Sequence, residues 1–515
     1  MGLLAIAGFA AYWSTLSSYF VGDDFETILK VTNLDQSGAL DHAGGTLRPV
    51  TWLSFAASWA VSGQSPTAFH VAGVAVHVVN AWLVALLARR LLDEFAPRPR
   101  PIDRFLPGLC GGIFLVLPTH TEAVSWIAAR GDLLMTTACL AALINWTRPA
   151  DGSWRRWLTT ALFAIAMLTK ESAITFPFVL VAFDVFRSRN EGGRRAMFAA
   201  IRRPWPEFLV VAGFLALRRA LRGNFLGGQD EALRSIDPLR LVAKAAVAVA
   251  RSLIPGMGGA GWLIGGVVLA TVALGAGIKG ARGDGPGRGM WWFLGSAVAI
   301  CVAPIANLGV QATGVGGERL IYLPSAFSVV AAVFMVRPLL VHSKRVTTAA
   351  LGFVVGLAFI SSVVVNGWWV DAGVASRGLI EPSAEWAVDQ RVVMLNSPDS
   401  IGGAVVARNS LAAASMLLHG WSEPALISEV SSVRLAGPLD RVEVTPGNCD
   451  SCVRLRLVEP GSSFAEMGTP GSAWEVPDID VEQIDERTIE VRLHNIPLAS
   501  VWYFHRGRAT RLPPR

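Results

Sequence analysis

The sequence predicts an α-helical polytopic membrane protein with a small β-rich domain at its C-terminal end. Of its 515 residues, 52% are hydrophobic and only 16% are charged, whereas soluble domains carry about 25% charged residues. The apolar residues come in blocks about twenty residues long, which is the length of a membrane helix. After residue 370 the blocks stop, and short runs alternate between apolar and polar side chains, as in β-strands.

The charge divides along the same line. Residues 371–515 hold 13 Arg, no Lys and 19 Asp or Glu, a net charge of −6. Residues 1–370 hold the other 32 basic and 20 acidic residues, a net charge of +12. Because the basic excess lies in the hydrophobic part, we attribute the pI of about 9.3 to cytosolic loops and not to nucleic-acid binding.

Eleven apolar blocks are expected to span the membrane. The first, residues 2–20, has no charged segment before it and no small-residue cleavage site, so we interpret it as a retained helix and not as a signal peptide. The others are residues 68–92, 105–118, 123–146, 157–168, 173–186, 208–217, 262–278, 290–306, 320–336 and 346–366.

Basic loops give the predicted orientation. With the N-terminus in the cytosol, five loops that hold 20 Lys and Arg all fall on the cytosolic side. The opposite orientation would place all five outside. We treat the Ala- and Val-rich stretch 232–254 as interfacial, because a further span there would invert every later loop. The loops that contain GDDFE, THTE, TKES and GGER then face outward, as does the C-terminal domain.

An acidic pair, Asp23 and Asp24, follows the first block directly. Adjacent side chains cannot both aim at one point, so at most one carboxylate acts on a substrate and the other orients a metal, a side chain or the loop. A carboxylate at the edge of an apolar cavity has a raised pKa, which suits a general base. The alternative is that the pair only solvates the end of the first helix.

Further polar side chains gather in the other outward turns, although charges are costly at a membrane. Each one alone is explained by an ion pair or an end-of-helix charge, but their joint appearance on one side indicates a polar site. They are His120, Glu122, Arg130, Asp132, Lys170, Glu171, Glu318, Arg319 and Tyr322.

A basic stretch between residues 218 and 251 is the largest exception to the charge rule. Its side chains are predicted either to hold a phosphate through bidentate hydrogen bonds or to contact ordinary anionic headgroups. The candidates are Arg218, Arg219, Arg222, Arg240, Lys244 and Arg251.

Five cysteines are too few for a disulfide scaffold. Cys449 and Cys452 lie between two predicted strands without a second Cys or His pair nearby, so zinc is not expected there. A local disulfide and two free thiols both remain open. Cys110, Cys139 and Cys301 lie within apolar blocks and are interpreted as packing residues.

The ordered motifs resemble one family of membrane enzymes. GDDFE, LRPVTWLSF, LPTHTEAVSWIAARGDLL, LTKESAITFPF and ERLIYLPS, in this order over roughly residues 15–335, resemble the polytopic GT-C glycosyltransferases, and within them the protein O-mannosyltransferase-like, TMTC-like branch. No tetratricopeptide-type repeats follow, so the chain departs from TMTC proteins there and is similar to a bacterial type. A protein acceptor of the TMTC kind is therefore in doubt.

The resemblance implies a function and roles for the motif residues. It implies sugar transfer from a polyprenyl-phosphate donor to an acceptor hydroxyl of a protein, a lipid or a cell-envelope glycan, at the outer face of a bacterial inner membrane. A first-loop Asp, Asp23 or Asp24, would act as general base and the anomeric carbon would invert. The other outward residues would line the cavity, and the basic stretch would hold the lipid phosphate. Some relatives use a divalent cation such as Mg²⁺ or Mn²⁺; we expect no obligatory metal here.

Two other classes of function compete with this interpretation. A transporter or lipid flippase would favour duplicated halves and charges near mid-membrane, but the charges here cluster at outward turns. A non-catalytic subunit of glycan assembly could keep the same fold, although the retained acidic pair argues against it. No P-loop or dinucleotide-binding motif occurs, as expected for an enzyme whose donor is already activated by its phosphate.

Overall fold

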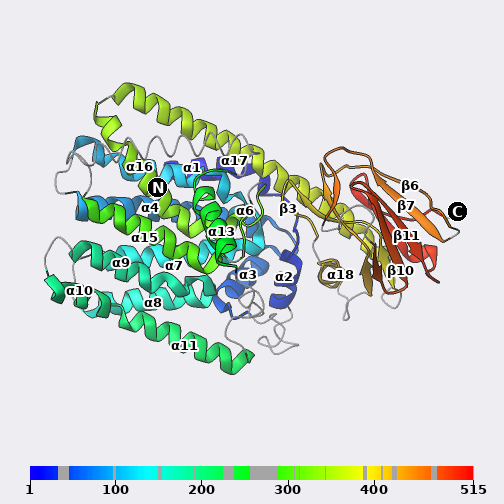
Figure 1. Ribbon diagram of the computed structural model, residues 1–515, viewed down its shortest axis with the longest axis horizontal. Helices are drawn as coiled ribbons and strands as arrows, with labels where there is room; N and C mark the ends of the chain where they lie inside the picture. Colours follow the sequence, from blue (N-terminus) through cyan, green and yellow to red (C-terminus); the bar gives the residue numbers. More distant parts are fainter. Residues whose placement is uncertain are drawn as a thin grey trace.

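A bundle of helices and a smaller group of β-sheets, joined by one long helix, make up the computed structural model (Figure 1). The structure describes residues 1–32, 46–96, 100–148, 153–188, 193–223, 237–255, 287–306, 308–311, 314–342, 344–386, 391–407, 410–419, 426–449, 451–465 and 473–513. The predicted block 262–278 and residues 33–45 of the polar loop after the first block lie outside these residues.

Within the described residues, five helical segments are long and apolar enough to cross a membrane. They are Thr67–Phe95, Ile127–Trp146, Arg288–Ile305, Glu318–Leu340 and Thr347–Glu385, and they contain helices α4 (Thr67–Phe95), α7 (Arg130–Trp146), α15 (Arg288–Val302), α16 (Tyr322–His342) and α17 (Lys344–Ile380). Each overlaps a predicted block. The chain is thus an integral membrane protein, as predicted.

The other predicted blocks are helical but shorter or less apolar. They form α1 (Gly2–Ala11), α5 (Leu106–Leu115), α8 (Ser153–Thr169), α9 (Phe176–Ser188) and α11 (Trp205–Arg222). At 1.5 Å per residue, the ten residues of α1 or α5 reach only about 15 Å, half of the hydrocarbon thickness. The number of eleven spans therefore stays a prediction.

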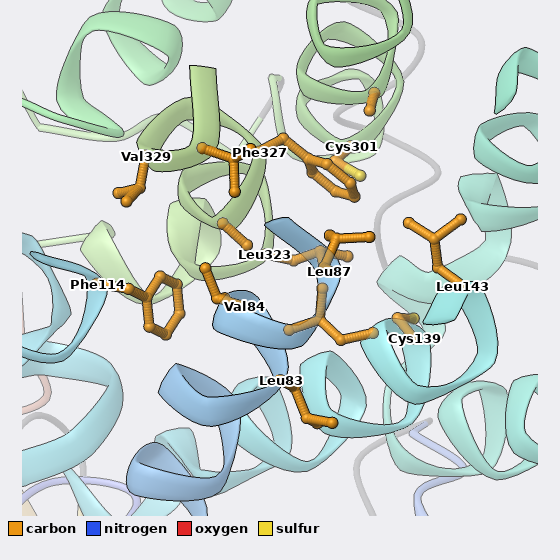
Figure 2. Close-up of a cluster of buried hydrophobic side chains, with 14 of the residues drawn as sticks. Leu83, Val84, Leu87, Phe114, Cys139, Leu143, Cys301, Leu323, Phe327 and Val329 are labelled. Carbon is orange, nitrogen blue, oxygen red and sulfur yellow. The ribbon is translucent and has the colours of Figure 1, made fainter. Parts of the chain in front are cut away.

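The core of the bundle surrounds α4. Leu87 and Val84 on this helix pack against Phe114 of α5, Leu143 of α7 and Phe327 of α16, all fully buried (Figure 2). Cys110, Cys139 and Cys301 are buried free thiols. Their interpretation as packing residues is confirmed.

Some helices of the bundle lie outside the predicted blocks. Helix α2 (Asp24–Thr32) begins at the acidic pair, α3 (Pro49–Ser62) follows the first polar loop, and α10 (Gly193–Arg202) lies in a basic loop. Proline at its first position favours the start of α3 because proline fixes φ and needs no intrahelical partner there. A fourth helix, α13 (Pro238–Arg251), falls within the stretch predicted as interfacial. It is capped by Asp237, and its Leu239 and Val242 are exposed.

The β-rich C-terminal part contains three sheets, with strand orders β13-β12-β1-β4, β6-β7-β11-β10-β9 and β3-β2-β5-β8. The strands are β1 (Val392–Met394), β2 (Ser397–Ile401), β3 (Ala404–Val405), β4 (Ile427–Glu429), β5 (Ser432–Leu435), β6 (Val442–Pro446), β7 (Cys452–Leu457), β8 (Ser463–Ala465), β9 (Ala473–Val476), β10 (Ile479–Asp485), β11 (Thr488–Leu493), β12 (Val501–His505) and β13 (Arg508–Arg511). One helix, α18 (Leu411–His419), accompanies them. Cys449 and Cys452 form a disulfide at the start of β7.

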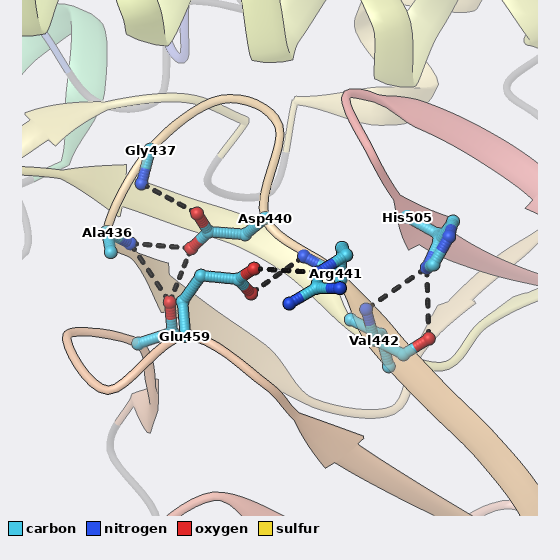
Figure 3. Close-up of polar contacts among 8 residues, drawn as sticks. Ala436, Gly437, Asp440, Arg441, Val442, Glu459 and His505 are labelled. Carbon is cyan, nitrogen blue, oxygen red and sulfur yellow. Dashed lines mark hydrogen bonds and ion pairs between the residues drawn. The ribbon is translucent and has the colours of Figure 1, made fainter.

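Polar side chains connect the sheets. Asp440 accepts the backbone N–H groups of Ala436 at 2.7 Å and Gly437 at 2.9 Å, which closes the turn between β5 and β6. On β12, a ring nitrogen of His505 lies 3.0 Å from the backbone nitrogen of Val442 on β6 (Figure 3). These contacts join strands of different sheets into one unit.

The C-terminal part packs directly on the helical bundle. Helix α17 passes residue 370 without a break and enters the β-rich part (Figure 1). One buried apolar cluster includes Phe25 and Trp126 from the bundle together with Val405 and Leu411 from the C-terminal part. The division of the chain into residues 1–370 and 371–515 stays a prediction, since no chain break or exposed linker marks it within the described residues.

Candidate active site

The two aspartates of the first loop have opposite environments. Asp24 is 1% exposed, and its carboxylate accepts the N–H groups of Val21 at 2.9 Å and Ala128 at 2.7 Å. Burial raises the pKa of Asp24 to about 8, although both N–H groups oppose the shift. Asp23 is exposed. Asp24 therefore connects the first loop to the loop after α6 (Thr121–Ser125) through hydrogen bonds. Asp23, by contrast, is accessible to solvent.

Glu122 organises a second loop. Its carboxylate accepts the backbone N–H of Gly317 at 3.2 Å and that of Arg319 at 2.7 Å. Burial raises the pKa of Glu122, and the nearby Arg319 is the strongest influence in the opposite direction. Glu122 thus holds the glycine-rich segment 314–319 against α6.

Arg319 lies over the ring of Trp126, with its guanidinium carbon 4.1 Å from the ring centroid. The side chain is half-buried, and within the described part of the chain its guanidinium donates no hydrogen bond to another residue. Trp126 precedes Ala128 by two residues. The segment 126–128 therefore contacts both residues: the Trp126 ring packs against the Arg319 guanidinium, and the Ala128 N–H donates to the Asp24 carboxylate.

Two ion pairs lie around the TKES turn. The ammonium of Lys170 is 2.5 Å from Asp132, with both side chains largely buried. Arg48 forms a two-pronged contact with Glu171, at 2.9 Å and 2.5 Å. Burial would raise the pKa of Glu171, but Arg48 lowers it to about 2. Burial lowers the pKa of Lys170, against the effect of Asp132, while Arg48 and Arg319 lower it further. The two ion pairs and Arg319 thus belong to one charged cluster.

Other predicted residues serve packing contacts. Arg130 donates to the backbone oxygens of Ser54 and Phe69, at 3.0 Å and 2.8 Å. His120 contacts Ser325 at 2.7 Å, and the Tyr322 hydroxyl contacts His77 at 2.6 Å. All three predicted residues are buried, so they stabilise the packing around the site and are not exposed in it.

The predicted basic stretch is divided among different places. Arg218 is buried and Arg219 exposed near the end of α11, which packs on α8. On α13, Arg240 and Lys244 are exposed, whereas Arg251 is buried and pairs with Glu318 at 2.5 Å. The side chain of Arg222 lies outside the described part of the structure. Helix α13 packs beside the segment that carries Arg319.

An apolar groove of about 500 Å³ opens between α9 and α15. Its lining residues are Thr175, Phe178, Val181, Ala182, Val185, Ser296, Ile300 and Ala303. Thr175 is the last residue of the short 3-10 helix that begins at Glu171, so one end of the groove lies four residues along the chain from the charged cluster. Such a shape suits a hydrocarbon chain whose polar end lies at the TKES turn.

Sequence reasoning missed two participants. Arg48 lies in the LRPVTW motif, but its partner Glu171 is 123 residues away, so no local pattern signals the pair. Trp126 lies in the HTEAVSW motif and was not singled out. Among the described residues, no three His, Cys, Asp or Glu side chains come together as metal ligands.

Comparison with known proteins finds relatives for part of the chain. No family model matches it. Protein O-mannosyl-transferase Tmtc1 of Drosophila melanogaster is 33% identical over 193 residues, covering 34% of this chain and 21% of the relative. Tmtc2 of the same fly is 32% identical over 205 residues, with coverages of 35% and 21%. Human TMTC3 is 28% identical over 197 residues, with coverages of 34% and 20%. The similarity thus spans about a fifth of each relative's length.

Solved structures show a distant likeness. ArnT from Cupriavidus metallidurans in the apo state has a TM-score of 0.48 at 11% identity, over 82% of this chain and 84% of that one. The same protein bound to undecaprenyl phosphate has a TM-score of 0.47 at 9% identity, over 95% and 97%. The sequence comparisons alone support the relationship: over about a third of its length, the chain is homologous to the TMTC-type protein O-mannosyl-transferases of the GT-C superfamily, as its ordered motifs predicted.

Proposed function

We propose that this chain is a membrane glycosyltransferase. It moves a sugar from a polyprenyl-phosphate donor to an acceptor hydroxyl of a protein, a lipid or an envelope glycan. The main support for this proposal is that the segment 126–128 contacts both the loop of Asp23 and the side chain of Arg319. The exposed Asp23 is next to Asp24, which is bonded to Ala128, and the Arg319 guanidinium lies over Trp126. One group can accept a proton and the other can bind a phosphate.

Geometry favours Asp23 over Asp24 as the general base. A base must come within hydrogen-bonding distance of the proton that it removes. Asp24 is 1% exposed and both of its oxygens accept backbone N–H groups, so an acceptor hydroxyl cannot reach it without opening the loop. Asp23 is exposed and is held by its neighbour's contacts. Asp24 is then a positioning residue.

The reaction is a single displacement. The acceptor oxygen attacks the anomeric carbon while Asp23 takes the hydroxyl proton, and the bond between that carbon and the phosphate oxygen breaks. The bonding electrons leave with the polyprenyl phosphate, and the configuration at the anomeric carbon inverts. Arg319 binds the phosphate as its negative charge increases, because a guanidinium offers parallel N–H donors to two phosphate oxygens.

The donor's lipid tail is assigned to the groove between α9 and α15. Its lining is apolar, it lies between α9 and α15, and its lining residue Thr175 is four residues from Glu171, which pairs with Arg48. A polyprenyl phosphate needs this arrangement, with the chain in hydrocarbon and the phosphate at headgroup depth. The placement of the basic loops supports an outward-facing site with a cytosolic N-terminus.

The test is sugar transfer by purified protein in lipid. A panel of polyprenyl-phosphate sugars, including the mannosyl donor, is offered with peptide, lipid and glycan acceptors, and radiolabelled product is measured. Transfer from at least one donor is expected. Binding of a donor without transfer to any acceptor would favour a non-catalytic subunit, and movement of the lipid across sealed vesicles without transfer would favour a flippase.

A further inference from the structure

A hairpin of the C-terminal part touches the candidate site. Strands β2 and β3 are joined by a turn at Gly402 and Gly403. The turn meets the loop of the proposed phosphate ligand, and the end of β3 meets the loop of the proposed base. We propose that the β2–β3 hairpin positions these two loops relative to each other, so that the C-terminal domain is part of the catalytic unit. The catalytic part of this inference rests on the proposed function.

The hairpin holds the first loop at the residue before Asp23. The backbone N–H of Gly22 donates to the carbonyl oxygen of Val406 at 2.9 Å. A Cβ atom on Gly22 would lie 2.6 Å from Cγ1 of Val405, and Gly22 has a φ of +50°. Any other residue would combine a steric clash with an unfavourable backbone conformation. Glycine therefore allows the first loop to meet β3 this closely.

The same hairpin holds the second loop. Val315 donates its N–H to the carbonyl oxygen of Gly402 at 3.3 Å. Gly403 has a φ of +91°, and a Cβ atom on it would lie 2.9 Å from the nitrogen of Val315. On its other side this loop is bonded to Glu122. The loop is thus fixed between the hairpin and α6.

The hairpin also packs against α17, at its turn. A Cβ atom on Gly402 would overlap the indole ring of Trp368. The turn therefore fills the space between α17 and the segment 314–317 without room for a side chain. A displacement of the whole hairpin would release Gly22 and Val315 together, and with them the relative placement of Asp23 and Arg319.

The chain offers a matched control for this contact. Gly403 and Gly507 are both positive-φ glycines in hairpin turns of the same domain, and both turns meet the helical body. The Gly507 turn meets α17 at Gly378 and touches neither loop in the contacts described above. Gly403→Ala and Gly507→Ala both place a Cβ atom on a residue with positive φ, at +91° and +77°, but only the first acts on the site loops.

Hydrogen–deuterium exchange of the full chain in lipid tests the positioning. We expect peptides covering residues 21–32 and 314–321 to exchange about tenfold faster in Gly403→Ala, because their local opening costs less free energy. They should exchange at the parent rate in Gly507→Ala. If Gly403→Ala does not fold, Val405→Ala removes the contact with Gly22 without backbone strain and should speed exchange of residues 21–32. Equal exchange in the Gly403 or Val405 variant and in the Gly507 control would overturn the positioning role.

Transfer kinetics separate this inference from the proposed function. Gly403→Ala should lower kcat about tenfold with little change in KM for the donor, as expected when reacting groups are misaligned, and Gly507→Ala should keep the parent kcat. A parent chain that transfers no sugar but shows the exchange pattern refutes the proposed function and leaves the positioning role standing. Parent-like kcat in a Gly403→Ala protein that has faster exchange refutes the catalytic part of the inference.

Discussion

At the scale of single residues, the acidic pair divides its tasks by burial. Asp24 is enclosed and bonded to two backbone N–H groups, and Asp23 is exposed. The sequence could place both carboxylates at the first outward loop, but it could not separate them. Their difference depends on Ala128, which lies 104 residues further along the chain. Long-range contacts of this kind leave no local pattern in a sequence.

The raised pKa of Asp24 makes stability depend on pH. The pKa rises from 3.8 to about 8 on folding, so the folded protein binds more protons than the unfolded chain between these values. The contribution of Asp24 to stability is therefore largest below about pH 4, and it is lost as the pH rises through about 8. Asp24→Asn should remove this component. Thermal unfolding of the parent and the variant at several pH values measures it, and parallel curves for the two proteins would contradict the burial argument.

Removing one partner of the Lys170–Asp132 ion pair should lower the stability of the protein. Lys170→Met leaves Asp132 almost fully buried without its cation and should destabilise the protein by about 3–5 kcal/mol. The double variant Lys170→Met/Asp132→Leu should recover much of this loss, because it leaves no buried charge. Denaturant unfolding compares the three proteins. A double variant no more stable than Lys170→Met would show that the ion pair is not the cause.

At the scale of elements, the long apolar helices were predictable and the shorter helices outside the apolar blocks were not. The blocks that became α4, α7, α15, α16 and α17 are long enough to stand out by hydropathy alone. Helix α3 mixes Ser and Thr with apolar side chains and has no distinct polar face. It lies against α2 and α8, so its helical state depends on packing. The pairing of α9 with α15, which forms the apolar groove, was equally hidden.

The groove gives a prediction at this scale. Ala182→Trp places a large ring in the groove and should raise the KM for the polyprenyl donor about tenfold, as expected for the loss of ~1.4 kcal/mol of binding. Leu209→Trp is the control, because Leu209 is an exposed apolar residue on α11 that does not line the groove. Binding of a fluorescent polyprenyl phosphate measures both variants. An equal effect of the two substitutions would show that the groove does not bind the donor's lipid tail.

At the scale of the whole molecule, the uneven charge first indicated two separate parts, but the structure joins them at the site. Val405 and Leu411 of the C-terminal part share one buried cluster with Phe25 and Trp126. The sequence identified the β-rich character of residues after 370 from its period of two. It could not predict the docking, because the contacts at Gly22, Gly402 and Gly403 involve residues without side chains, which carry no hydrophobic pattern.

The central claim is that Asp23 is the general base of a sugar transfer and that Asp24 holds its loop. The most direct measurement is the single-turnover rate of transfer from a polyprenyl-phosphate sugar by the parent, Asp23→Asn and Asp24→Asn proteins in lipid. We expect Asp23→Asn to keep the parent's thermal stability and donor binding while its rate falls about 10²- to 10⁴-fold, the typical contribution of a general base. Asp24→Asn should change stability as well as rate. A parent-like transfer rate in Asp23→Asn would show that Asp23 is not the general base.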